Sequence, residues 1–168
     1  MPPASTLSEL YAFEKYFEDS AVTFIEANTS VEVYASASLE NFITPRIEIS
    51  FRAMEAVEPS DSPISLGLDE YRKYTGVFEA TIITDSSVGG TQTRAFHLDL
   101  VGKVRATMLR TQPNWNGTTL PWYGIKLIRQ ISFDRTTDGD LELSMLNWDV
   151  YFSIRSTAFP TTTTTPAP

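Results

Sequence analysis

The chain has 168 residues, the usual size of one domain with at most a short appendage, and its 42% hydrophobic content supplies a core, which excludes global disorder. With no cysteine and one histidine, disulfide frameworks, thiolate metal sites and cysteine nucleophiles are excluded, and little remains for a proton relay. The net charge of −8 argues against tight nucleic-acid binding. The charge is unevenly distributed, with 15 acids and 5 bases in residues 1–90 and 6 acids and 8 bases in residues 91–168, and this permits association between unlike faces of identical subunits.

An amphipathic helix is predicted near the N-terminus. Ser5 or Ser8 can cap this helix, which runs to about Ala27. Hydrophobic residues recur along it at spacings of three and four and form the expected buried stripe: Leu10, Phe13, Phe17, Ala21 and Phe24.

Three strands are predicted after this helix. Residues 31–35 alternate as a short strand does, and the sequence RIEISFRAM after Pro45 predicts a second strand. Alternation places Ile47, Ile49 and Phe51 on one face of that strand. An acidic loop with Pro and Ser is expected over residues 55–68, followed by a third strand, Tyr71–Asp85, rich in β-branched and aromatic residues.

A second helix and a closing hairpin are predicted in the rest of the chain. The helix covers about residues 91–110, and its expected buried stripe contains Phe96, Leu100, Val101, Val104 and Met108. Two long strands, about residues 122–133 and 141–155, are joined by a turn around Asp138-Gly139, a dipeptide suited to positive φ angles. The even-numbered side of the last strand, which includes Trp148, is the expected core face.

This order of elements predicts an α+β domain over residues 1–155, with one mostly antiparallel sheet and two helices packed on one face. Residues 156–168, STAFPTTTTTPAP, cannot bury enough apolar surface to fold alone. We expect them to form an extended arm that reaches a neighbouring subunit or an adjoining protein, with Phe159 as its anchor.

No catalytic, cofactor or metal site is recognisable in the sequence, so we predict a protein without enzymatic activity and without cofactors. His97 falls in the apolar arc of the second helix and lacks a carboxylate and a nucleophile at recognisable spacing, which favours a packed or capping residue over a catalytic base. Residues 134–142 partly match a calcium loop, but Met145 stands at the twelfth position and strands flank the segment, which favours a solvated hairpin turn.

Other features also have two interpretations. Glu14 and Glu18 lie one turn apart on a helix edge and indicate an intersubunit contact or nothing. Gly89-Gly90 lacks the Lys-Ser/Thr that completes a phosphate loop, so we expect a flexible loop. The second helix is basic, which indicates a nucleic-acid surface or, as the favoured interpretation, a salt-bridged or subunit-facing helix; its bases are Arg94, Lys103, Arg105 and Arg110. Large aromatics flank a turn and indicate an interface anchor or a satellite core cluster: Trp115, Trp122 and Tyr123.

The N-terminal helix is followed in order by TPRIEISF, YTGVFEATIIT, HLDLVGKVRATML and a closing hairpin. In this order, over about residues 7–155, the chain resembles the tail terminator proteins of long-tailed bacteriophages. The resemblance implies a subunit of a hexameric ring that caps the head-proximal end of the tail tube, stops tube polymerisation and meets the neck.

The resemblance also implies the partners: other copies of the chain, the tail tube protein and a neck or head–tail connector protein, with DNA passing through the channel without specific binding. No signal peptide and no apolar run of ~18 residues is present, so we expect a soluble protein that assembles in the host cytoplasm and resides in the virion, without a membrane. Two alternatives stay open, namely another neck or tail-completion ring subunit, and a soluble ligand-binding module.

Overall fold

The computed structural model describes residues 4–35, 43–54, 71–110 and 123–155. The elements are, in order, α1 (Ala4–Thr29), β1 (Val33–Ala35), β2 (Arg46–Met54), β3 (Tyr71–Asp85), α2 (Arg94–Arg110), β4 (Tyr123–Asp138) and β5 (Leu141–Arg155). The expected acidic loop at 55–68, Trp115, Trp122 and the arm with Phe159 lie outside the described residues. Among the described residues, no helix combines the length and apolar character needed to span a membrane.

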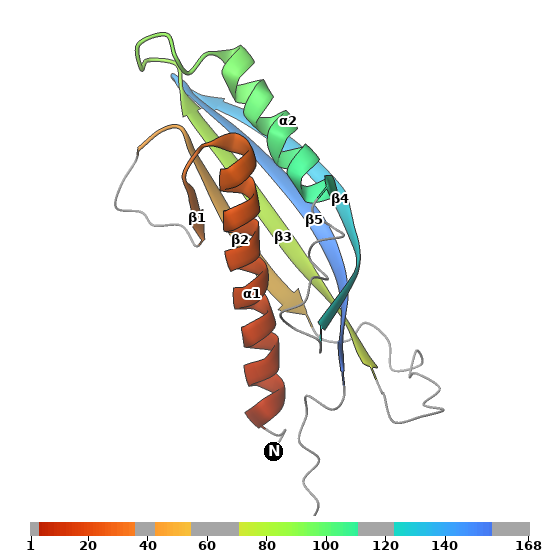
Figure 1. Cartoon of the computed structure of the whole chain (residues 1–168). Coiled ribbons are helices and arrows are strands. Elements are labelled where there is room, and N and C mark those ends of the chain that lie inside the picture. The colour runs from red at the N-terminus through yellow and green to blue at the C-terminus, as the bar shows by residue number, and fades with distance from the viewer. Residues whose placement is uncertain (1–3, 36–42, 55–70, 111–122, 156–168) are drawn as a thin grey trace, which may run out of the picture.

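The strands form one sheet in the order β1-β2-β3-β5-β4. β1 pairs with β2 in parallel, and the other neighbouring pairs are antiparallel. Both helices lie on one face of this sheet, α1 over β1 and β2 and α2 over β3 and β5 (Figure 1). The predicted α+β fold, with one mostly antiparallel sheet and two helices on one face, is confirmed.

The core lies between the helices and the sheet. The even-numbered side of β5 faces it, as predicted, and Trp148 on this side is 2% exposed. Ile47, Ile49 and Phe51 of β2 are buried on the same side. Burial of these strand faces against two apolar helix stripes is the main favourable term in folding. The largest fully buried side chains include Phe13, Phe17, Phe78, Leu100, Met108, Leu146 and Phe152.

Several predicted details of the helices are wrong. α1 begins at Ala4, so Ser5 and Ser8 lie inside the helix and do not cap it. On α2, Phe96 is only partly buried. In α1 the buried stripe continues from Ala21 to Ile25, and Phe24 is only partly buried because the stripe keeps a spacing of four residues. α2 begins at Arg94 rather than near residue 91, because the Thr93 hydroxyl accepts a hydrogen bond from the Phe96 N–H at 3.2 Å and so caps the helix.

The strands also differ in length from the expectation. β1 begins at Val33 rather than at residue 31, and β4 continues to Asp138, five residues beyond the predicted end. β4 is longer because its pairing with β5 extends to the turn itself, where Asp138 faces Leu141. Gly139 has a φ of 59°, which confirms the predicted hairpin turn.

Gly76 on β3 provides a test of core packing. A Cβ atom at this position would lie 2.5 Å from ring carbons of Phe51, whereas a Cβ atom at Gly102 on α2 would meet nothing within 4 Å. We expect Gly76→Ala to lower the free energy of unfolding by about 1–3 kcal/mol through overpacking. The matched control Gly102→Ala should raise it by up to about 1 kcal/mol, because alanine favours the helix. Denaturant unfolding measures both, and equal effects of the two changes would contradict this packing.

Candidate interaction surface

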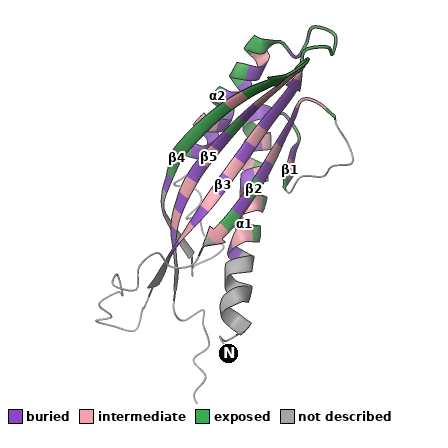
Figure 2. Ribbon diagram, turned by 180° about the vertical axis from the view of Figure 1, so that it is seen from behind, coloured by how far each residue is buried: buried purple, intermediate pink, exposed green. Residues whose placement is uncertain are grey.

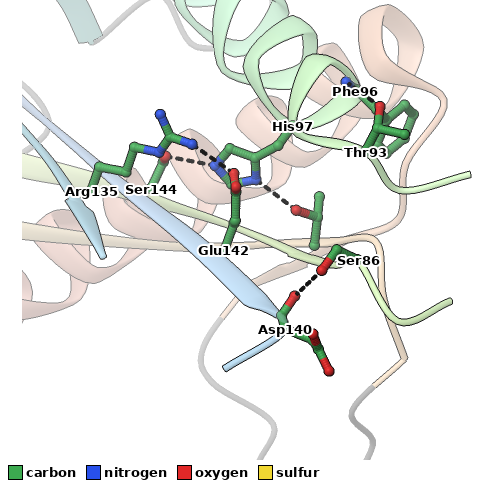
Figure 3. Close-up of polar contacts among 9 residues, drawn as sticks. Ser86, Thr93, Phe96, His97, Arg135, Asp140, Glu142 and Ser144 are labelled. Atoms are coloured by element: carbon green, nitrogen blue, oxygen red, sulfur yellow. Dashed lines mark hydrogen bonds and ion pairs between the residues drawn. The ribbon is translucent and has the colours of Figure 1, made fainter. Parts of the chain in front are cut away.

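A buried histidine joins α2 to the sheet. His97 is 0% exposed, and its ring lies between a hydroxyl of β3 and a hydroxyl of β5. The Nδ1 atom lies 2.8 Å from Thr84 Oγ1, and the Nε2 atom lies 2.7 Å from Ser144 Oγ (Figure 3). Both ring nitrogens are therefore engaged within the fold, and His97 is a packed residue, as predicted.

The surroundings of His97 favour its neutral form. Burial lowers the pKa of the imidazole, because the charged form loses its hydration. The Glu142 carboxylate raises this pKa and the Arg135 guanidinium lowers it. These two groups form an ion pair of 2.8 Å beside the ring (Figure 3), so their effects on the ring oppose each other.

The lowered pKa predicts a pH dependence of stability. His97 is the only histidine, so few other groups titrate between about pH 7 and pH 5. The unfolded chain takes up the proton first as the pH falls below about 6.5, so the free energy of unfolding should be highest above that pH and decrease below it. In His97→Gln this decrease between about pH 6.5 and pH 5 should disappear from thermal melting curves. An unchanged slope in the variant would contradict the buried neutral histidine.

One edge of α1 is bonded to the edge of the sheet. β1 pairs with β2 only from Ile47 to Ile49, so the N–H groups farther along β2 lack a strand partner on that side. Glu18 Oε1 accepts from the Phe51 N–H at 2.9 Å, and Glu14 Oε1 accepts from the Ala53 N–H at 2.8 Å.

A third carboxylate extends this contact to β1, since Glu26 Oε1 accepts from the Val33 N–H at 3.0 Å. Glu14, Glu18 and Glu26 thus serve their own sheet, a role that sequence reasoning missed. The common helix edge of Glu14 and Glu18 was visible in the sequence, but the strand groups that they bond were not.

Removing these acceptors should destabilise the fold. Glu14→Ala combined with Glu18→Ala leaves the N–H groups of Phe51 and Ala53 without their acceptors. A hydrogen bond to a charged group contributes about 1.5–3 kcal/mol, so the double variant should lose a few kcal/mol of unfolding free energy. Glutamine at both positions keeps an acceptor oxygen and should recover most of the loss. If the alanine and glutamine variants unfold at the same denaturant concentration, these bonds do not stabilise the sheet edge.

The hairpin and the loop beside it are explained by contacts within the fold. The partial calcium motif at residues 134–142 spans the β4–β5 turn, and Arg135 pairs with Glu142 there. Among the described residues, no group of three or more His, Asp or Glu is placed to hold a metal ion. Gly89 and Gly90 have φ of 54° and 76° in a loop whose Ser86 N–H donates to the Asp140 carbonyl at 2.8 Å, so the loop packs on the turn.

The basic residues of α2 make different contacts. Lys103 pairs with Asp99 one turn away at 2.8 Å. Arg105 lies over the ring of Phe133 on β4, 4.5 Å from its centroid. Arg94 is exposed, and the side chain of Arg110 lies outside the described residues. These contacts favour the salt-bridged helix over a nucleic-acid surface.

The second face of the sheet is polar and partly exposed. Arg129 on β4 lies 3.3 Å from Asp149 on β5, and Asn147 donates to Ser132 at 3.0 Å. Met145 on this face is 39% exposed. Among the described elements, neither helix covers this face, and β4 is exposed along much of its length (Figure 2).

Fold and surfaces together define a small α+β protein with one helix-covered and one open sheet face. Neither protein-family models nor curated proteins give a match to the chain. Among solved structures, the chain is similar to a chain of the virion of a native gene transfer agent particle, with a TM-score of 0.49 and 11% identity, over 82% of this chain and 90% of that chain. Similarity at this level carries no information about function.

Proposed function

We propose that the chain is a structural virion protein of a phage-like particle, a tail terminator whose copies form a ring. In this role the ring caps the head-proximal end of the tail tube, stops its polymerisation and joins the tail to the neck. The sequence resemblance to tail terminators supports the proposal. Its segments TPRIEISF, YTGVFEATIIT and HLDLVGKVRATML fall on β2, β3 and α2, the elements that build the sheet and its second helix.

The observation that carries the proposal is the opposite charge of the two helices. α1 has five acidic residues and one basic residue, a net charge of −4. α2 has four basic residues and one acidic residue, a net charge of +3 with His97 neutral. The helices lie side by side on one sheet face, so their outer sides face away from each other. A ring needs two unlike, complementary surfaces on each subunit, and this arrangement provides them.

The proposed partners are further copies of the chain, the tail tube protein and a neck or connector protein. A hexameric ring located at the tail–neck junction leaves a channel for DNA, and the net charge of −8 repels the phosphate backbone, so DNA passes without specific binding. The role needs no enzymatic activity and no cofactor. Residues 156–168 act in this proposal as an extended arm that docks on a neighbouring subunit or an adjoining virion protein.

Assembly of the purified chain tests the proposal. We expect sedimentation velocity and negative-stain imaging to reveal rings at low ionic strength. The rings should loosen as salt is raised toward about 1 M, where the Debye length falls to about 3 Å and exposed charge pairs are screened. A chain that stays monomeric at every concentration and salt would overturn the proposed ring. Rings that are insensitive to salt would keep the ring and exclude charge pairing as its cause.

A further inference from the structure

Exposed hydrophobic side chains gather on the side of the molecule formed by α2 and β4. Leu98 is 44% exposed and Leu109 is 67% exposed on α2, while Ile131 is 47% and Phe133 is 41% exposed on β4. These four are the majority of the seven large hydrophobic residues exposed in the described part of the chain. Together with Arg105 they define the α2/β4 flank.

The helix spacing brings the residues of this flank together. Leu98, Arg105 and Leu109 are separated by seven and four residues, which places them on one side of α2. Arg105 lies over the Phe133 ring, so this side of the helix borders β4. The Arg105 Nε atom is buried without a hydrogen-bond partner, and among the described residues no carboxylate forms an ion pair with Arg105.

The two edges of the sheet differ in a way that favours contact at β4. A two-residue hairpin is closed by a hydrogen-bonded pair of residues, here Asp138 and Leu141. Backbone groups alternate in direction along an antiparallel strand, so every second residue of β4 directs its N–H and C=O away from β5. These outward-directed residues are Phe133, Arg135 and Thr137. Figure 2 shows this strand exposed along the edge. At the opposite edge, α1 carboxylates already bond strand N–H groups. Within the described residues, the β4 edge therefore leaves the longer row of backbone groups open, beside exposed apolar side chains.

We infer that the α2/β4 flank is the docking surface for a second copy of the chain, which contacts it with its acidic α1/β1 flank. The acidic α1/β1 flank consists of the α1 carboxylates that border β1 and β2 and one exposed acid that follows the helix: Glu14, Glu18, Glu26 and Glu32. In this contact the apolar residues of the α2/β4 flank are buried, and Arg105 pairs with a carboxylate of the neighbour. The inference rests on the proposed self-assembly and adds the surfaces that carry it.

The charges select this head-to-tail contact over a symmetric one. Two α2/β4 flanks facing each other would bring two sets of excess positive charge together, and two acidic flanks would repel in the same way. One flank of each kind pairs opposite charges and leaves an unused flank at each end. Such heterologous contacts close into rings when the rotation between copies permits.

Single substitutions on exposed residues test the α2/β4 flank. Leu109→Asp should weaken self-association by about tenfold or more, because it introduces a carboxylate into the buried contact. Val88, 46% exposed on the β3–α2 loop, provides the matched control, and Val88→Asp should assemble as the unsubstituted chain does. Thermal melting checks that both variants fold. If Leu109→Asp assembles normally while the unsubstituted chain forms rings, the inferred surface is wrong and the proposed function stands.

Mixing two variants tests the head-to-tail geometry. Glu32→Lys places a positive charge on the exposed part of the acidic α1/β1 flank, so it should disrupt this flank and, like Leu109→Asp, should yield monomers. In a 1:1 mixture each pair of unlike variants retains one intact contact, so sedimentation should detect heterodimers and nothing larger. A mixture that stays monomeric would overturn the head-to-tail contact, and self-association of either variant alone would favour a symmetric one. If the unsubstituted chain is itself monomeric, the proposed function fails together with this inference.

Discussion

Three carboxylates on one edge of α1 hold that helix against the edge of the sheet by accepting hydrogen bonds from strand N–H groups. The same helix packs its aromatic stripe on the sheet, where Phe13 stacks on Phe152 with ring centroids 4.0 Å apart and Phe17 stacks on Phe51 at 4.4 Å. Rotation of α1 about its axis would break both sets of contacts at once. The position of α1 is therefore fixed by hydrogen bonds on one side and by aromatic packing against the sheet. Because α2 packs beside α1, the position of α1 also limits where α2 can lie.

The carboxylate contact also makes the two edges of the sheet unequal. An unpaired strand edge invites pairing with another chain, and covering it is one way in which proteins prevent this. Here the edge at β1 and β2 is occupied by acidic side chains, whereas the edge at β4 retains its backbone groups beside exposed apolar residues. The acidic side of the molecule is therefore also the side with the covered sheet edge, and the basic side is the one with the open edge. A subunit with two complementary sides requires such a difference between its sides.

A buried histidine, rather than carboxylates, joins α2 to the sheet. His97 contacts hydroxyls on β3 and β5, two neighbouring strands of the sheet, and bonds both without a formal charge in the core. A neutral imidazole between two hydroxyls costs less to bury than an ion would, because no charge loses its hydration. Both helices thus combine an apolar stripe with a few directed hydrogen bonds, which determine where along the sheet each helix lies.

The sequence by itself determined the elements and the faces that they bury. Strict alternation in RIEISFRAM and in the last strand, the apolar stripe of α2, and the Asp138-Gly139 turn are local patterns, because strand and helix periodicity act over a few residues. Only the tertiary structure decided the parallel pairing of β1, the extension of β4, and the partners of Glu14, Glu18 and His97. Glu14 and Ala53 are 39 residues apart, and His97 and Ser144 are 47 apart. Such bonds depend on how whole elements are positioned in space, which no local pattern encodes.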